Sequence, residues 1–221
     1  MKTEDPTPPG PVVNPDDEKE ETFGTKVIYL SFVGKGLSNG NKILNTLSAS
    51  NIKAAFFVTY DDILAYPDTL RRIYTAGHTI GITFTEDAEA LCSEGGIEEC
   101  IIRAEDALYE ILKTKTRLVY LDTSTNTALY KEADMNSRIE AMGLRSVEMN
   151  VDAKTGILGG AAASAAASSA IKSLEVSHKT TSAYVKLTFS ESARTVCTSL
   201  VKIASEQRGV SISLFDEASV K

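Results

Sequence analysis

Short apolar runs alternate with helix-like segments along most of the chain, and this alternation is the feature that most restricts the fold. The runs occupy residues 26–32, 52–59, 78–84, 116–121, 145–151, 183–189 and 210–215. Amphipathic helical patterns lie between most of them, for example at 97–113 and 191–207. Repeated strand–helix units with continuously apolar strands predict an α/β fold with a parallel sheet covered by helices. About seven such strands favour a distorted (β/α) barrel, and the pattern alone leaves an open sheet as the alternative.

Glycines at the helix–strand junctions support the repeat. Gly77, Gly143 and Gly209 each follow a helical run and precede a strand-like run. Glycine readily takes the left-handed conformation that ends a helix before the chain turns back. Three equivalent junctions therefore indicate that one structural unit recurs along the chain.

The first 22 residues differ sharply from the rest in composition. Five of the six prolines lie within residues 6–15, and residues 1–22 contain seven acidic side chains against two lysines, which is −5 of the total charge of −7. Such a segment cannot bury enough apolar surface to fold. The sequence predicts a disordered acidic tether over residues 1–25 and one barrel domain over residues 26–221.

The tether also bears on where the protein acts. An acidic, Pro-rich segment directly before a strand is typical of the linker below a removed export signal or lipid anchor, so an extracellular or envelope-attached protein is expected. A cytoplasmic protein with an irregular terminus is the alternative. No apolar run reaches the length of a membrane span, and no basic patch indicates binding of nucleic acid.

The three cysteines give a weak signal. Cys92 and Cys100 flank a Gly-Gly pair and could form a disulfide, although simple burial explains them equally well. Cys197 falls on the apolar stripe of a helical pattern and is expected in the core. There is no CxxC pair and no zinc-ligand spacing.

No catalytic motif stands at the predicted strand ends, where barrel active sites form. These positions are rich in Ser, Thr, Asn and Asp, which suit sugar hydroxyls but are equally typical of solvated loops. The nucleophile elbow and the P-loop are missing from the sequence, and no carboxylate pair has a spacing that requires acid/base chemistry. The residues alone therefore predict no catalytic group, metal ligand or cofactor.

Taken in order, several segments resemble the polysaccharide deacetylase (NodB-homology) domain of carbohydrate esterase family 4. They include "KVIYLSFVGKG", "NIKAAFFVT", "AGHTIGITFTED" and "KTRLVYLDTSTNT", and the resemblance extends over residues 26–218. It implies a distorted (β/α) barrel that removes acetyl groups from cell-wall glycans or chitin. A divalent metal bound by one aspartate and two histidines would polarise the acetyl carbonyl and a water.

The departures from this family pattern fall on its metal-binding and catalytic positions. Val33 and Gly34 stand where the family has the catalytic base and a metal-binding aspartate. Thr83 and Asp87 stand at its two metal histidines. Glycine and threonine cannot replace a carboxylate and a histidine as ligands, so the resemblance implies a barrel without a complete metal site.

Three further family positions are changed. Tyr120 and Asp122 replace the arginine and proline of the third motif, and Phe189 replaces the histidine of the last. The strand and helix patterns persist while these positions differ, which a general drift of the sequence would not produce. The resemblance therefore favours a pseudoenzyme of this family with no cofactor.

The leading interpretation is a catalytically inactive domain that binds cell-wall polysaccharide or an envelope protein through the former substrate groove. The expected groove residues are Ser31, Lys35, Thr83, Asp87, Tyr120, Asp122, Asn126 and Asp152. One alternative is a hydrolase acting on C–N or ester bonds with a rebuilt site at Asp87, Asp122 or Asp152. Another is a structural or assembly role at the cell envelope.

Overall fold

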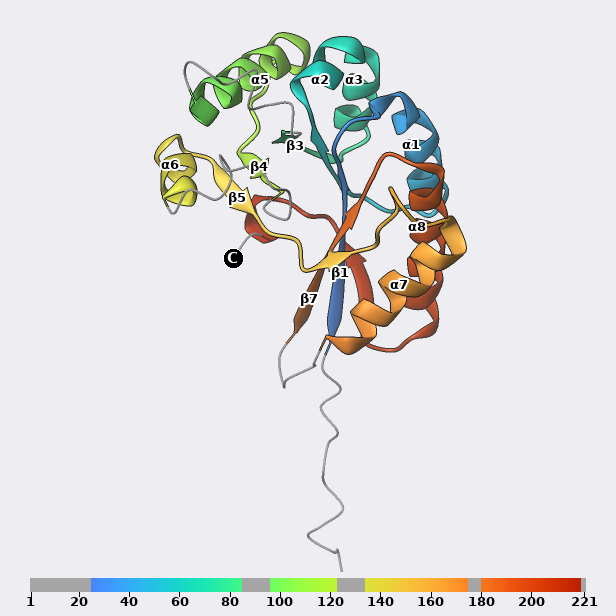
Figure 1. The fold of residues 1–221 in the computed structure, drawn as a ribbon. Helices are drawn as coiled ribbons and strands as arrows, with labels where there is room; N and C mark the ends of the chain where they lie inside the picture. The colour runs from blue at the N-terminus through green and yellow to red at the C-terminus, as the bar shows by residue number, and fades with distance from the viewer. Residues whose placement is uncertain (1–24, 85–95, 123–133, 175–179, 220–221) are drawn as a thin grey trace, which may run out of the picture.

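The computed structural model describes residues 25–84, 96–122, 134–174 and 180–219. Its strands all pair in parallel, and helices cover the outer side of the sheet (Figure 1). The strands are β1 (Lys26–Val33), β2 (Ala55–Val58), β3 (Thr79–Thr83), β4 (Leu118–Tyr120), β5 (Arg145–Val147), β6 (Val151–Asp152), β7 (Thr181–Leu187) and β8 (Val210–Ser213). The predicted α/β architecture, a distorted barrel of parallel strands, is confirmed.

Seven strands lie on one hydrogen-bonded path in the order β5-β4-β3-β2-β1-β7-β6. β8 pairs with the N-terminal part of β1, from Lys26 to Tyr29. The C-terminal part of β1, from Ser31 to Val33, pairs with β2. The run predicted as one strand at 145–151 forms two, β5 and β6, separated by Glu148–Asn150. These two short strands stand at opposite ends of the path, and no described residues pair them, so the barrel is open between them.

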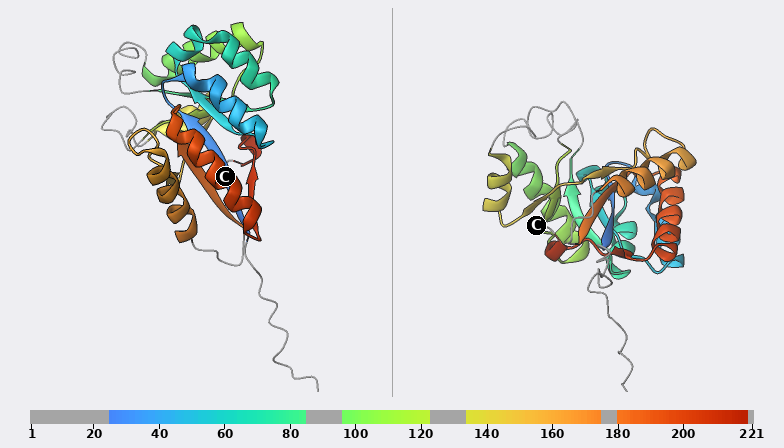
Figure 2. Two further views of the ribbon diagram at one scale, coloured as in Figure 1. Left: turned by 90° about the vertical axis from the view of Figure 1, so that its right-hand side faces the viewer. Right: turned by 90° about the horizontal axis from the view of Figure 1, so that it is seen from below.

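The helices lie on the outer side of the strands, as the two further views show (Figure 2). They are α1 (Gly40–Ala49), α2 (Tyr60–Ala65), α3 (Pro67–Thr75), α5 (Gly96–Leu112), α6 (Met135–Ala141), α7 (Gly160–Ser173) and α8 (Glu191–Glu206), with short 3-10 turns at Leu37–Asn39 (η1) and Glu217–Ser219 (η3). Within the described residues, no helix is both long and apolar enough to cross a membrane.

Alternate residues of each strand point to opposite faces of the sheet, and the two faces are packed differently. On β1, Ile28, Leu30 and Phe32 face the helices and belong to the main hydrophobic core. Tyr29, Ser31 and Val33 point the other way, into the barrel, where Val33 joins a smaller cluster of buried side chains. Any groove residue carried by a strand must therefore occupy this second, inward-facing set.

The lower half of the barrel interior, on the side of the N-terminal ends of β1 and β7, is filled by aromatic rings. Tyr29 of β1 and Tyr184 of β7 stack with their centroids 5.0 Å apart. Phe215, which follows β8, is 1% exposed and lies 5.2 Å from the Tyr184 ring and 6.2 Å from the ring of Phe57. These ring contacts pack this part of the barrel interior.

The predicted helix–strand junctions are also confirmed. Gly77, Gly143 and Gly209 have φ angles of 76°, 78° and 81°, the left-handed region that other residues rarely adopt. Each precedes a strand, so the glycines set the point at which the chain turns from a helix back into the sheet.

Candidate functional site

The candidate site is a polar hollow at the C-terminal ends of the strands, the end at which barrel proteins place their sites. Its volume is about 340 Å³. The strand ends at β4, β5, β6 and β7 contribute to the wall, and α6 adds part of the rim. The lining residues are Tyr120, Leu121, Asp122, Met135, Asn136, Ser146, Val147, Glu148, Met149, Asp152 and Lys186.

Lys186 is the central charged group of this hollow. It lies on β7, points into the barrel, and forms an ion pair with Asp122, which follows β4. Both side chains are less than one-fifth exposed. The Lys186 ammonium also lies 5.8 Å from the centroid of the Tyr120 ring, within the range of a cation–π contact.

The surroundings of Lys186 keep it protonated. Burial lowers the pKa of Lys186, but its hydrogen bond to Asp122 and the nearby Tyr120 and Asp152 more than offset this, so the pKa stands above its usual value. Burial raises the pKa of Tyr120 as well, which keeps its phenol neutral. The hollow therefore contains a permanent cation at neutral pH.

Ser31 and Thr83 lie deeper in the barrel. The Thr83 hydroxyl donates to the Tyr120 carbonyl at 2.9 Å and is thereby occupied. Ser31 is fully buried, and its hydroxyl has no hydrogen-bond partner among the described residues. Ser31 is in register with Lys186 on the adjacent strand, so the two side chains point to the same face of the sheet.

The loop after β1 is held in place by a carboxylate from α2. Asp62 accepts hydrogen bonds from the backbone amides of Gly36 and Leu37 at 3.0 and 3.2 Å. Burial raises the pKa of this carboxyl group although both hydrogen bonds act against the shift. Lys35 is exposed on the same loop and does not line the hollow.

The expected groove residues thus divide into three groups. Tyr120, Asp122 and Asp152 line one hollow together, Ser31 and Thr83 are buried in the barrel, and Lys35 lies apart on the exposed loop. Asp87 and Asn126 lie outside the described residues. The sequence analysis missed Lys186, because a single lysine in a strand such as "AYVKLTF" is typical of a solvent-facing position.

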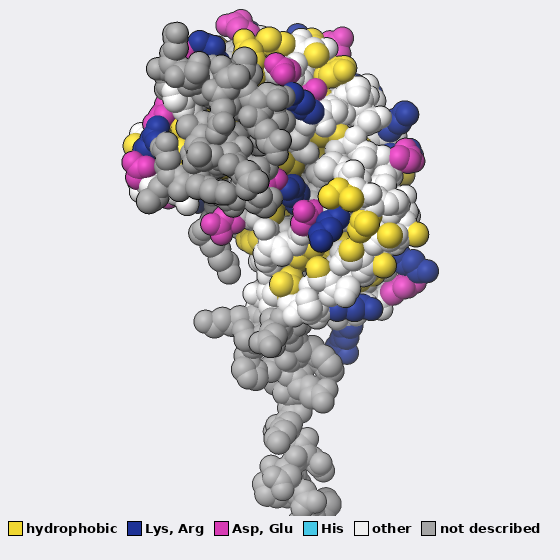
Figure 3. Space-filling view, in the orientation of Figure 1, with side chains coloured by type: hydrophobic (Ala, Val, Ile, Leu, Met, Phe, Trp, Pro, Cys, Tyr) yellow, Lys and Arg dark blue, Asp and Glu magenta, His cyan; other side chains and the backbone are white. Residues whose placement is uncertain are grey.

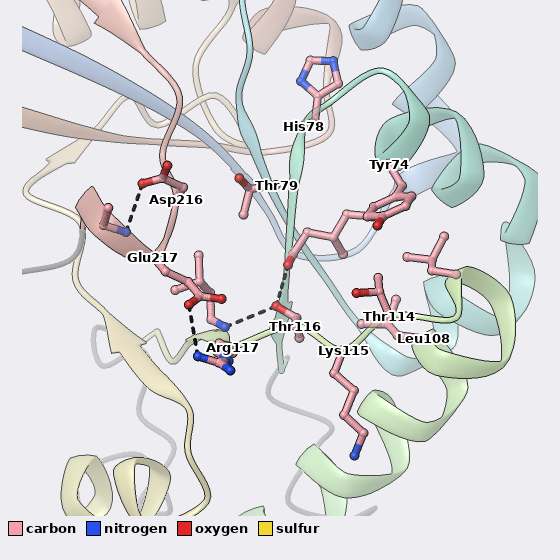
Figure 4. Close-up of a pocket in the computed structure, with 14 residues that line it drawn as sticks. Tyr74, His78, Thr79, Leu108, Thr114, Lys115, Thr116, Arg117, Asp216 and Glu217 are labelled. Carbon is pink, nitrogen blue, oxygen red and sulfur yellow. Dashed lines mark hydrogen bonds and ion pairs between the residues drawn. The ribbon is translucent and has the colours of Figure 1, made fainter.

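A second hollow, of about 410 Å³, lies at the opposite end of the sheet, beside the starts of β3 and β4 (Figure 4). Its polar groups mostly bind one another. Arg117 pairs with Glu217 at 3.6 Å, and the Thr116 hydroxyl donates to the Ile80 carbonyl at 2.6 Å. The hollow around Lys186 lies at the C-terminal ends of the strands, where barrel sites form, and is therefore the stronger candidate site.

A comparison with models of protein families assigns the chain to a known class. The model of the polysaccharide deacetylase family matches residues 20–143, which is more than half of the chain. The chain therefore belongs to the polysaccharide deacetylase family. A search of curated proteins finds no match.

Solved structures of similar fold come from the same class. A polysaccharide deacetylase from Bacillus cereus is 18% identical, with a TM-score of 0.70 over 88% of this chain and 94% of that one. The catalytic domain of a peptidoglycan N-acetylglucosamine deacetylase from Eubacterium rectale is 16% identical, with a TM-score of 0.72 over 96% and 94%. A Streptococcus mutans CE4 esterase is 18% identical, with a TM-score of 0.69 over 87% of each chain. At these identities the likeness shows a shared fold.

Proposed function

We propose that this domain binds cell-wall glycan in the hollow around Lys186 and does not deacetylate it by the metal-dependent route of its family. The observation that carries the proposal is the ion pair between Lys186 and Asp122 inside the hollow. The Lys186 ammonium already pairs with the carboxylate that would otherwise attract a divalent metal.

The residues at the family's metal positions support this proposal. Gly34 offers no side chain, and the neutral Thr83 hydroxyl is bound to the Tyr120 carbonyl. Neither replaces an aspartate or a histidine as a ligand. Within the described ranges, no three His, Cys, Asp or Glu side chains lie close enough together to hold a metal ion. These residues do not fit the family's metal centre.

The lining of the hollow suits a sugar. Its volume of about 340 Å³ is that of a small-molecule site, and Asp122, Lys186, Asn136 and Ser146 supply hydrogen-bond donors and acceptors along its wall. The Tyr120 ring is 6% exposed and belongs to the same wall. The hydroxyls of a sugar can hydrogen-bond with these polar groups.

A location in the cell envelope is part of the proposal. Cys100 is disulfide-bonded, whereas Cys197 is a buried free thiol. Cys92, the partner suggested by the sequence, lies outside the described residues. Disulfides persist mainly in oxidising compartments, which favours export. Related solved structures include peptidoglycan deacetylases from Bacillus subtilis and Eubacterium rectale, which is consistent with a cell-wall ligand.

An NMR titration of the isotope-labelled protein tests the proposal. The ligands are chitin oligomers, glucosamine oligomers and peptidoglycan fragments. We expect backbone shifts to change at Tyr120, Asp122, Asp152 and Lys186. Residues around the second hollow, such as Thr116, should not respond and serve as the internal control. Unchanged spectra with every glycan would disprove the proposed function.

A second candidate function is hydrolysis with a rebuilt site, favoured by the presence of Asp122 and Asp152 in one hollow. It predicts acetate release from an acetylated glycan, and loss of that release in an Asp122→Ala variant. An enzyme assay with the full chain tests this candidate. It is eliminated if acetate is released no faster with the protein than without it.

A third candidate is an assembly role, favoured by the outer surface. Four of the five large hydrophobic side chains that the described residues expose lie on the mutually packed helices α2, α3 and α5. They are Leu64, Tyr74, Ile102 and Tyr109. Exposed apolar side chains on neighbouring helices favour a protein contact on this side of the molecule. Sedimentation of the wild type beside a Leu64→Ser/Ile102→Ser variant tests it through loss of self-association.

A further inference from the structure

The hollow around Lys186 continues along the opening between β5 and β6. A neighbouring hollow of about 550 Å³ lies there. Asn136, Ser146, Val147 and Glu148 belong to the linings of both, so the two form one cleft. Each part has the size of a small-molecule site, and the cleft has room for more than one sugar unit.

The cleft has a net negative charge. Its described lining contains four carboxylates and a single cation, Lys186, which leaves a formal charge of −3. The carboxylates are Asp122, Glu140, Glu148 and Asp152. Lys186 is already paired with Asp122, whereas the other three carboxylates form no ion pair with a described residue. Charged and neutral side chains lie close together in the middle of this face, beside the atoms drawn in grey (Figure 3).

An independent observation concerns the layer of inward-facing side chains that contains Lys186. The Ser31 hydroxyl is fully buried, lies in the layer of Lys186, and has no hydrogen-bond partner among the described residues. Buried hydroxyls are normally hydrogen-bonded, and leaving one unsatisfied costs free energy. Ser31 does not itself line the cleft, so a water held in this layer and hydrogen-bonded to a polar ligand group would satisfy it.

We infer that the cleft selects glycans with free amino groups, that is, de-N-acetylated amino sugars, over their N-acetylated counterparts. The inference rests on the proposed glycan binding and specifies its ligand. A free amine on the sugar is an ammonium near neutral pH and can pair with Glu148 or Asp152. An N-acetyl group carries no charge, so it forms no ion pair with these carboxylates and is not attracted by the net negative charge of the cleft.

The size of the preference follows from the exposure of the carboxylates. Glu140, Glu148 and Asp152 are exposed, and each ion pair made at such a position contributes little on its own. Two or three pairs on one oligomer together give roughly a tenfold preference. Because the pairs are solvent-exposed, the preference shrinks as the salt concentration rises.

Calorimetric titration of the full chain at low salt tests the inference with matched ligands. The first pair is a glucosamine pentamer and an N-acetylglucosamine pentamer. The second is a peptidoglycan fragment before and after chemical de-N-acetylation, which distinguishes a chitosan-like source from a cell-wall source. Spermine is the control for charge without a sugar. We expect roughly tenfold tighter binding of the free amine in at least one pair, and weaker binding of spermine.

Two double variants test whether the preference for free amines arises from the carboxylates of the cleft. Glu148→Gln/Asp152→Asn should remove the preference, because it deletes two exposed charges of the cleft without disturbing a buried contact. Glu110→Gln/Glu206→Gln makes an equal change of charge on α5 and α8 outside the cleft and should keep the preference.

The outcomes separate this inference from the proposed function. Equal binding of the acetylated and free-amine forms in both pairs overturns the selectivity while leaving glycan binding in place. Spermine binding as tightly as the glucosamine pentamer overturns it too, since bare charge would then suffice. If no glycan of either kind binds, the proposed function fails and the inference fails with it.

Discussion

The lower and upper halves of the barrel interior are lined by the same strands but differ in polarity. Tyr29 and Tyr184 stack in the lower half, and two residues further along β1 and β7 stand Ser31 and Lys186. Two residues span only about 7 Å of strand. Within that distance the interior changes from packed aromatic rings to a buried ion pair. The core below can therefore stay intact while the chemistry above it changes.

The largest expected effect breaks the lower half. Phe215→Ala removes a ring that is 1% exposed and contacts three other aromatic rings, so it should lower the free energy of unfolding by about 3–4 kcal/mol. Phe215→Leu keeps most of the volume and should cost about 1.5 kcal/mol at most. Urea unfolding measures both. A loss below about 1 kcal/mol for the alanine variant would show that the aromatic cluster does not hold the barrel together.

The next effect is the pH dependence of stability caused by His78, the residue before β3. Burial, with a smaller contribution from Lys53, lowers the pKa of His78 from 6.5 to about 4, and its Nδ1 accepts a hydrogen bond from the Ala54 amide. The unfolded chain therefore binds a proton between these values that the folded chain does not. Stability is full above pH 6.5 and falls as the pH drops towards 4, by at most about 3 kcal/mol.

Thermal unfolding across this pH range measures that loss. His78→Asn is the matched control, because its amide oxygen can accept the same hydrogen bond but does not titrate. It should flatten the stability profile between pH 6.5 and 4. An equal slope in both proteins would assign the acid sensitivity to groups other than His78.

A smaller effect concerns the upper half. Lys186→Met leaves the carboxylate of Asp122 in a largely buried hollow without its cation, which should cost about 2 kcal/mol. The double variant Asp122→Asn/Lys186→Met removes both charges and should recover at least half of that loss. Denaturant titration of the two variants measures the coupling. Independent, additive losses would mean that the pair does not act as a unit.

The smallest effect compares two buried hydroxyls. Ser31→Ala removes a group with no described partner and should change stability by less than about 0.5 kcal/mol, or increase it. Thr83→Ser keeps the hydroxyl bonded to Tyr120, whereas Thr83→Val removes it and should cost about 1–2 kcal/mol. A large loss at Ser31 would reveal a hydrogen bond that the described residues do not make.

The sequence predicts the fold well because strand and helix patterns are local. Each of the other apolar runs corresponds to one strand, whereas the run 145–151 forms two, β5 and β6. Its break at Glu148–Asn150 could not be predicted locally, because the two strands belong to opposite ends of the sheet. The site is less accessible to such reasoning. Lys186 meets Asp122 across 64 positions of the chain, and no spacing rule connects them.

Glycan binding without a metal is the central claim, and one NMR titration tests it most directly. A mixture of N-acetylglucosamine and glucosamine oligomers is added to the full chain with and without a chelator, and the acetate signal is recorded in the same spectra. The predicted result is equal shifts at Tyr120, Asp122 and Lys186 under both conditions, with no acetate formed. Loss of binding on chelation, or acetate release that depends on added metal, would contradict it.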